Sequence, residues 1–249
     1  MNSCKGTLST SFLLVALFSC PAHAQTQPAA ASRFVLDLGV GIDVSVNGNV
    51  NSGAIGRLQG QAAAILPNPY GEVYGTGLHF TFGGGYVLNA DTELRGVFTY
   101  QSADADLVRL GDVGPSSLYG QYSDYKTLGL DLGYRRYVPL QNSKLRIYGE
   151  ATIGAAFIDS INVVLSAPQA NLVIDQTDFY DSTAAFTWGI NFGVLFPVSE
   201  KLDFNTQFGL RHVSGLSEVD QFIGTGLDDI NNDSARLTFP IVVGVRLRF

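Results

Sequence analysis

The chain has 249 residues, of which 46% are hydrophobic and 15% charged, and its formal net charge is −7. This composition is too apolar and aromatic for a disordered protein, and its acidity excludes a general nucleic-acid binder. Beyond the N-terminus no apolar run reaches the ~20 residues of a membrane-spanning helix, which leaves a transmembrane β-barrel as the expected class.

The N-terminus has the pattern of a signal peptide. Lys5 supplies a positive charge, residues 11–18 form an apolar core, and the small residues at 22 and 24 fit the cleavage rule. We therefore expect residues 1–24 to be cleaved, residues 25–32 to form a short periplasmic segment, and residues 33–249 to form the barrel.

The two cysteines, Cys4 and Cys20, both lie within this signal. Acylation of Cys20, as in a lipoprotein, is the alternative interpretation of the N-terminus. With the signal removed, neither thiol catalysis nor a cysteine-ligated metal is expected.

Eight segments follow in which apolar and polar residues alternate with period two, as in β-strands. They span residues 34–46, 78–88, 93–101, 127–136, 145–157, 186–196, 202–211 and 236–249. Their apolar faces carry one charged residue, Arg136, whereas the opposite faces carry seven arginines and six carboxylates. A charge facing lipid at mid-bilayer costs about 2–4 kcal/mol, so this depletion indicates apolar faces exposed to lipid. The alternative, a soluble β-sandwich, would carry more lysine and glutamate on its solvent faces.

The connections alternate between short and long. Short ones lie near residues 89–91, 138–143 and 197–201, and long ones near 47–72, 102–124, 159–181 and 215–234. The sequence therefore predicts an all-β fold, a closed antiparallel barrel of eight strands with short periplasmic turns and long extracellular loops.

One long connection contains a further strand pattern. Between Ile161 and Ile174, two apolar runs flank Pro168-Gln169-Ala170, which predicts a hairpin that extends above the bilayer. Ten strands are the alternative, if this hairpin enters the membrane.

The chain finishes with alternating apolar residues and a final aromatic: Ile241, Val243, Val245, Leu247 and Phe249. This segment resembles the C-terminal assembly signal of outer-membrane proteins. Residues 33–249 as a whole resemble small barrels of the OmpA transmembrane-domain, OmpX and OmpW type. The resemblance implies a location in the cell outer membrane, insertion by the barrel-assembly machinery, and a monomer in contact with outer-membrane lipid and lipopolysaccharide.

An eight-stranded barrel has an interior that side chains can just fill, and each buried charge there needs a partner. The candidates at mid-height are Asp37, Asp131, Glu150, Arg95, Arg146 and Arg246. We expect them to form a packed, closed ionic network, although a gate that exchanges partners and passes small ions is an alternative.

The four long connections hold fourteen acidic residues against three basic ones, a net charge of −11. Such a surface suits hydration, contact with a cationic partner, or divalent ions that bridge to lipopolysaccharide phosphates. Asp228, Asp229 and Asp233, with Asn231 and Asn232, offer oxygen ligands of the type that Ca²⁺ uses, but without EF-hand spacing.

His212 and Ser214 form a His-x-Ser pair at the outer end of the seventh segment, with Asp233 or Glu218 as a possible acid. This pair resembles that of lipid A deacylases, in which the histidine activates the serine for attack on an acyl ester. Gly215 stands where that family has asparagine, however.

The sequence therefore favours a non-enzymatic barrel with a structural role in the envelope or a role in surface interaction through its acidic loops. It predicts no cofactor, resident metal or nucleic-acid partner. A channel for ions or small solutes and a lipid-modifying esterase are the alternatives.

Overall fold

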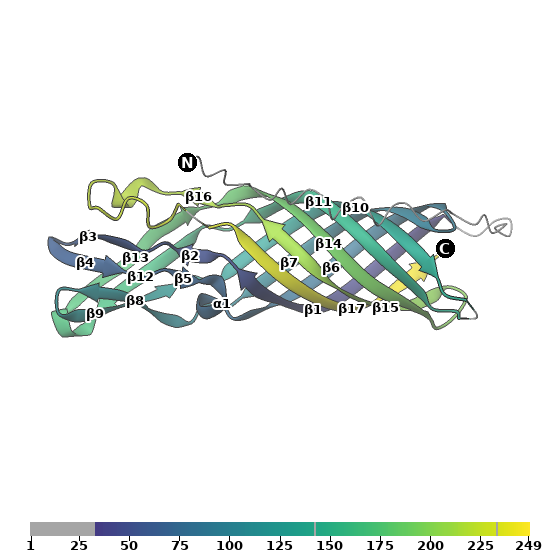
Figure 1. Cartoon of the computed structure of the whole chain (residues 1–249), viewed down its shortest axis with the longest axis horizontal. Coiled ribbons are helices and arrows are strands. Elements are labelled where there is room, and N and C mark those ends of the chain that lie inside the picture. The colour runs from purple at the N-terminus through teal and green to yellow at the C-terminus, as the bar shows by residue number, and fades with distance from the viewer. Residues whose placement is uncertain (1–32, 142, 233) are drawn as a thin grey trace, which may run out of the picture. The chain divides into compact units, whose positions relative to one another are not determined.

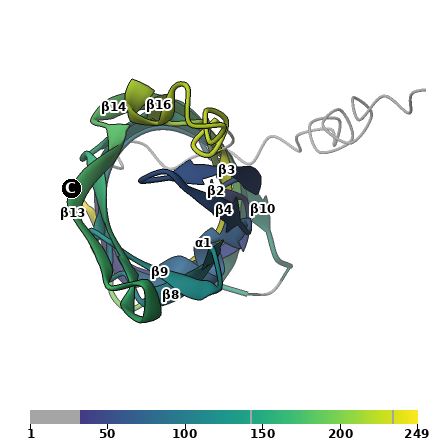
Figure 2. The same ribbon diagram turned by 90° about the vertical axis from the view of Figure 1, so that its left-hand side faces the viewer.

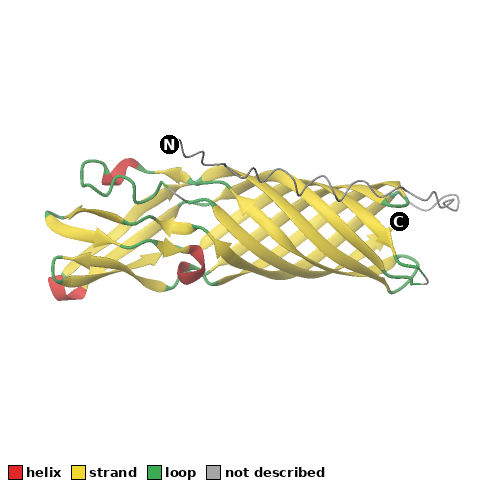
Figure 3. Cartoon of the chain, in the orientation of Figure 1, coloured by secondary structure: helices red, strands yellow, loops and turns green. Residues whose placement is uncertain are grey.

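The computed structural model describes residues 33–141, 143–232 and 234–249, which lie in one compact unit. The predicted signal and the segment 25–32 lie outside the described residues. Strands dominate the described part (Figure 3). No helix in it is long and apolar enough to cross a membrane.

Eight long strands close into a barrel, as predicted (Figure 1). Around the barrel their order is β1-β17-β15-β14-β11-β10-β7-β6, and every neighbouring pair is antiparallel. The strands are β1 (Phe34–Asn47), β6 (Thr76–Asn89), β7 (Thr92–Ala103), β10 (Tyr125–Pro139), β11 (Arg146–Ile158), β14 (Thr183–Pro197), β15 (Leu202–Val213) and β17 (Arg236–Arg248). Closure pairs every strand on both sides, so hydrocarbon meets no open sheet edge.

The alternation in the sequence decides which side chains face outward. Leu38, Phe82, Leu130, Phe186 and Phe208 all project from the outer wall and are exposed. The residues between them point into the barrel, where the polar and charged side chains are buried. The barrel is therefore apolar outside and polar inside, as expected of a barrel that spans a membrane.

The two ends of the barrel differ. At one end, here called the turn end, residues 90–91, 140–145 and 198–201 connect the strands. At the opposite end, here called the loop end, the connections span residues 48–75, 104–124, 159–182 and 214–235. This difference confirms the predicted alternation of connection lengths.

The long connections fold into a second sheet beyond the loop end (Figure 1). Its order is β16 (Ser217–Glu218), β13 (Leu172–Asp181), β12 (Ile161–Ala167), β9 (Ser116–Tyr122), β8 (Leu107–Val113), β4 (Gln61–Ile65) and β3 (Ala54–Leu58). The hairpin of β12 and β13 confirms the one predicted between Ile161 and Ile174, and the 3₁₀ turn η2 (Pro168–Ala170) joins its strands. Because this hairpin stays out of the barrel, the ten-stranded alternative is wrong.

The fourth long connection closes the gap between the two ends of this sheet. It contains the 3₁₀ turn η3 (Asp220–Phe222). The amide of Arg57 in β3 donates to the Thr225 carbonyl at 2.7 Å, and the Ser52 amide donates to the Ile230 carbonyl at 2.7 Å. All four long connections therefore form one unit, which we call the loop-end module (Figure 2).

The loop-end module has an apolar core, the reverse of the barrel beneath it. Its buried side chains include Leu58, Ile65, Leu110, Leu118, Val163, Leu165, Phe179, Phe222, Leu227 and Ile230. The core continues into the barrel mouth through Ala103, Ile158, Ala185 and Val213. From the sequence these connections were expected to be acidic loops, and the core that they share was not predicted.

A short insertion from the first long connection packs into the same core. It comprises β2 (Asn49–Asn51), β5 (Asn68–Pro69) and α1 (Tyr70–Val73). The Tyr180 hydroxyl donates to the Val50 carbonyl at 2.7 Å, and the Tyr122 hydroxyl donates to Asn51 Oδ1 at 3.0 Å. Burial raises the pKa of Tyr70 and Tyr122 well above the ordinary value, so these phenols remain protonated donors.

The module core yields a prediction. Phe179→Ala removes a buried ring from the centre of the module, and such a truncation costs about 3–5 kcal/mol of local stability. We expect the loop-end module to become sensitive to limited proteolysis while the barrel keeps its heat-modifiable gel mobility. Ile55→Ala, on the exposed face of β3, is the control and should resist cleavage like the wild type. Equal resistance of Phe179→Ala would contradict the shared core.

Candidate functional site: the ionic lumen and its closed mouth

The lumen contains all thirteen charged residues of the polar faces, and each one makes a salt bridge. They are Asp37, Asp43, Glu93, Arg95, Asp131, Arg135, Arg146, Glu150, Asp203, Arg211, Arg236, Arg246 and Arg248. Alternation along the strands places them inside, and closure of the barrel brings carboxylates and guanidinium groups within reach across the interior.

Arg95 on β7 forms the central bridge. Its guanidinium lies 2.9 Å from Asp37 on β1 and 2.6 Å from Glu150 on β11. Strands β1 and β11 are four positions apart around the barrel, so Arg95 links opposite walls. Arg135 on β10 adds a second bond to Glu150, at 2.7 Å. These side chains are at most 7% exposed, so their charges have little access to water.

A second bridge lies nearer the turn end. Arg246 on β17 forms an ion pair with Glu93 on β7 and donates to the Tyr137 hydroxyl on β10 at 2.6 Å. That hydroxyl in turn donates to Glu93 at 2.8 Å. The guanidinium carbon of Arg135 lies over the Tyr148 ring, 3.7 Å from its centroid.

Two further clusters lie toward the loop end. Asp131 accepts bonds from Thr187 at 2.6 Å and from Arg211 at 3.1 Å. Above it, Asp43 accepts bonds from Gln101 and, at 2.9 Å, from Arg236. The Gln101 amide also contacts His79 Nδ1 at 3.0 Å. The lumen is therefore crossed by polar contacts at several levels.

The structure brings together most of the mid-height residues named from the sequence. Asp37, Arg95 and Glu150 share one network, while Asp131 and Arg246 take partners that the sequence analysis did not name, Arg211 and Glu93.

The placement of Arg146 is a correction. Arg146 was expected at mid-height, but it is the first residue of β11 and lies at the turn end, where it pairs with Asp203 at 3.4 Å. Its side chain is 34% exposed. The alternation identified the correct face, but the depth of a residue depends on where its strand begins.

The space left between these side chains is small. A cavity of about 50 Å³ lies among Asp37, Arg95, Thr99, Asp131 and Arg211. Asp37 Oδ1, Thr99 Oγ1 and Arg211 Nη1 lie on it without a hydrogen-bond partner among the described residues. A cavity of this size has room for a few water molecules, which would satisfy these atoms.

The mouth above is closed by aromatic side chains. Tyr70, Tyr74 and Tyr125 contact one another with ring centroids 5.7–6.2 Å apart. The Arg236 guanidinium lies 4.4 Å from the Tyr125 ring, and the Tyr70 hydroxyl donates to the Ser234 carbonyl at 3.2 Å. The aromatic cluster therefore separates the ionic lumen from the apolar core of the module.

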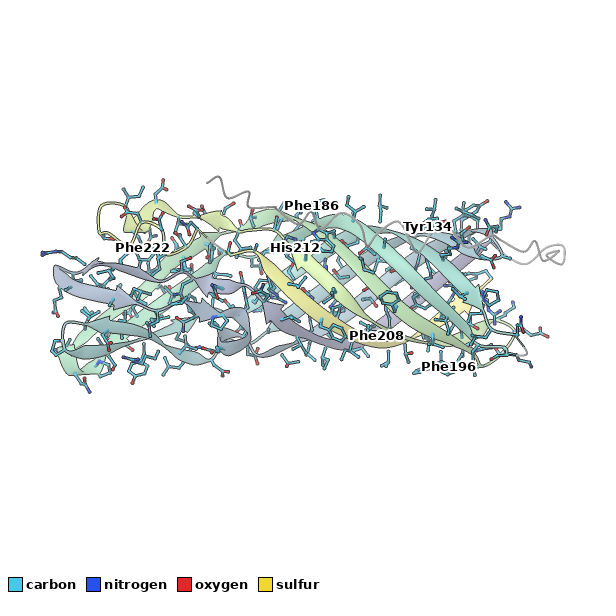
Figure 4. All side chains as sticks on the ribbon, in the orientation of Figure 1. Tyr134, Phe186, Phe196, Phe208, His212 and Phe222 are labelled. Atoms are coloured by element: carbon cyan, nitrogen blue, oxygen red, sulfur yellow. The ribbon has the colours of Figure 1, made fainter. Side chains whose placement is uncertain are left out.

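His212 lies on the outer wall near the loop end (Figure 4). Its ring stacks on Trp188, with centroids 5.4 Å apart. Ser214 Oγ accepts the Phe186 amide at 2.9 Å, and within the described ranges no hydrogen bond joins His212 to Ser214. Of the acids considered, Glu218 lies in β16 beside Tyr180, and Asp233 lies outside the described residues.

The predicted calcium ligands lie in the fourth long connection, and most are engaged within it. Asp228 accepts the Gly224 amide at 2.6 Å, and Asp229 accepts the Asn232 amide at 3.1 Å. Asn231 turns into the core and donates to the Phe179 carbonyl at 3.0 Å. Across the part of the chain that is described, no three acidic, histidine or cysteine side chains are grouped to hold a metal ion.

The apolar residues of the C-terminal segment lie on the outward-facing side of β17, and Phe249 directly follows that strand. Ile241, Val243, Val245, Leu247 and Phe249 are all exposed. Their function as an assembly signal stays a prediction.

The chain matches one protein-family model and is similar to several solved structures. The family model described as "Outer membrane protein beta-barrel domain" matches residues 10–246. Among curated proteins there is no match. Solved structures with a similar fold include Neisserial surface protein A, at 13% identity and a TM-score of 0.45, which aligns over 88% of this chain and 99% of its own.

Two other solved structures are similar at the same level. OprG from Pseudomonas aeruginosa has 13% identity and a TM-score of 0.46, over 88% of this chain and 96% of its own. The protease OmpT from Escherichia coli has 8% identity and a TM-score of 0.45, over 90% of this chain and 100% of its own. At these identities the likeness concerns the fold alone.

The central bridge yields a prediction for stability. Arg95→Met leaves Asp37 buried without its ion-pair partner, and breaking a buried pair costs about 3–5 kcal/mol. We expect a loss of that size in the free energy of unfolding, measured by urea titration in lipid vesicles with Trp188 fluorescence. Arg146→Met, which breaks the partly exposed pair with Asp203, should cost less than about 1 kcal/mol. Addition of Asp37→Asn to Arg95→Met should recover part of the lost free energy of unfolding, because it removes the unpaired charge. Equal losses in Arg95→Met and Arg146→Met would contradict the stabilising role of the central bridge.

Proposed function

Because this chain belongs to the outer membrane protein β-barrel domain family, we propose that it is a closed, non-enzymatic barrel of the outer membrane that presents its loop-end module to partners at the cell surface. The family and its location in the outer membrane are the premise. The proposal concerns the role of the barrel and the direction in which its module faces.

The observation that carries this proposal is the apolar core shared by all four long connections. Eight strands and short turns are enough to satisfy the backbone in a bilayer, so the module is not needed for insertion. Ordering so many residues also costs conformational entropy, at about 1–2 kcal/mol per residue. A folded module of this kind supports a role for its outer surface.

That surface is strongly acidic. Of the acidic residues in the long connections that the structure describes, all but the partly exposed Asp112 are exposed. The basic residues of these connections are Arg57 and Arg109, and Lys126 follows at the start of β10. Two of the three already pair with acids, Arg109 with Asp112 and Lys126 with Asp124. A rigid surface with this excess of negative charge favours a cationic partner.

The alternative roles have less support in the geometry. A channel needs a continuous path, whereas the lumen has bridges between opposite walls and an aromatic seal at its mouth. An esterase needs His212 to activate Ser214, whereas the Ser214 oxygen accepts a backbone amide and His212 stacks on Trp188. Unchanged lipid A acylation in cells that overexpress the chain would exclude the esterase.

The closed lumen predicts the outcome of electrical recording. We expect the purified, folded barrel in planar bilayers to show no stable unitary conductance, because charge pairs cross the lumen at several depths. Insertion is checked in parallel by heat-modifiable mobility of the same preparation. Large and reproducible conductance steps would contradict the closed lumen and favour the channel.

The acidic surface predicts binding to polycations. We expect nanodiscs that contain the barrel to bind poly-L-lysine, with an affinity that falls as salt rises. The variant Asp220→Asn/Asp228→Asn/Asp229→Asn should bind about threefold to tenfold more weakly, since it removes exposed charge from one edge of the module. The control is Asp91→Asn/Glu200→Gln, which neutralises one partly exposed acid and one exposed acid at the turn end. Equal weakening by both variants would contradict a surface specific to the module.

A further inference from the structure

The lipid-facing wall has a depression near the turn end where two adjacent strands carry glycine. Along one level of the barrel, Leu36 pairs with Gly84, Gly84 with Gly96, and Gly96 with Leu132. All four positions face outward. Two neighbouring positions on the membrane surface therefore lack side chains.

Larger side chains enclose this depression. The level toward the loop end carries Phe82 and Phe98, and the level toward the turn end carries Tyr86 and Leu94. The resulting groove has a volume of about 540 Å³. Its lining includes Tyr86 and Leu94 together with Phe34, Leu36, Leu132 and Phe249, whereas Phe82 and Phe98 lie beyond it. It opens toward the bilayer and is apolar except at its turn-end border.

The two glycines are not required by packing of the barrel. A Cβ added at Gly41 or Gly154, inside the lumen, would lie about 2 Å from a carbonyl oxygen of the adjacent strand. In contrast, a Cβ at Gly96 would meet nothing within 4 Å, and one at Gly84 would lie 3.9 Å from Leu36. Neither glycine has a positive φ angle. Glycine weakens a strand, and one reason for its presence is the close approach of a ligand, for which these two positions leave space.

A cation lies at the turn-end border of the groove. The Arg33 guanidinium donates to the Tyr86 hydroxyl at 3.1 Å, and the Arg33 side chain is otherwise exposed. Arg136 lies at the same end of the outer wall, with Asp91 in the nearby turn. Among the described residues of the turn end, six are basic (Arg33, Arg136, Lys144, Arg146, Lys201 and Arg248) and three are acidic (Asp91, Glu200 and Asp203).

We propose that this groove binds one anionic phospholipid, with an acyl chain over Gly84 and Gly96 and the headgroup phosphate at Arg33. A hydrocarbon chain matches the aromatic and aliphatic walls, and lipid surrounds a groove that opens into the bilayer. A guanidinium beside a tyrosine at the membrane interface is suited to a phosphate, since it donates two parallel hydrogen bonds. The excess of basic residues at the turn end favours an anionic headgroup over a zwitterionic one.

Native mass spectrometry of the folded barrel tests the proposal, with phosphatidylglycerol and phosphatidylcholine of the same chain length as probes. We expect one phosphatidylglycerol to remain bound, about fivefold more tightly than phosphatidylcholine, which is the factor given by one basic residue at an anionic surface. Arg33→Gln should abolish this preference while weak binding of both lipids persists. Gly96→Leu should remove the bound lipid, because the new side chain occupies the groove and its Cβ meets no atom within 4 Å.

Gly149→Leu is the matched control. Gly149 also faces lipid, on β11, with the Phe192 ring 3.9 Å from the position of its Cβ, and it is not part of the lining of the groove. This variant should bind lipid like the wild type, and heat-modifiable mobility verifies that each variant is folded. Equal retention of the two lipids by the wild type, or a bound phospholipid that survives Gly96→Leu, would overturn the proposal. Loss of binding in Gly149→Leu as well would overturn it too, since the effect would not belong to the groove.

Discussion

The structure depends on the separation of charge from hydrocarbon. In a bilayer the backbone must satisfy its hydrogen bonds within the protein, which a closed set of antiparallel strands achieves. Alternation then directs every second side chain inward, and of the thirteen ionisable groups placed there all but Arg146 and Arg248 are buried. Each of them needs an opposite charge, because an unpaired buried ion is strongly destabilising. The ionic lumen, with Arg95 between opposite walls, follows from these two requirements.

The same reasoning explains the loop-end module. Where the strands leave the membrane, the surroundings of their outer face change from hydrocarbon to water. Polar residues are then favoured on the outer face and apolar residues on the inner face. On β11 the inward residues accordingly change from Glu150 and Thr152 to Ala156 and Ile158. Beyond the barrel mouth the interior is an ordinary hydrophobic core, which burial of apolar surface stabilises. The mouth is therefore closed by the packing that also holds the four long connections together.

Because the lumen is closed, the outer surfaces are the parts of the barrel that other molecules can reach. The acidic face of the module and the groove over Gly84 and Gly96 are in different surroundings, water in one case and lipid in the other. Each has a feature that the stability of the fold does not explain, since neither the excess of carboxylates nor the absence of two side chains improves packing. We consider these surfaces, and not the buried ion pairs, the places where this barrel meets other molecules.

Much of the barrel could be predicted from the sequence because the period of alternation is a local property. It determined the eight strands, the lipid-facing side of residues such as Leu130, and the inward direction of all thirteen charges. The tertiary structure decided which charges meet, because Arg246 and Glu93 lie three strands apart around the barrel and no spacing along the chain encodes that distance. It also decided the depth of Arg146 and the core of the module, whose members, such as Leu58, Leu118, Phe179 and Ile230, come from four separate connections. Contacts of this kind exist only once the barrel has closed and brought those connections to the same end.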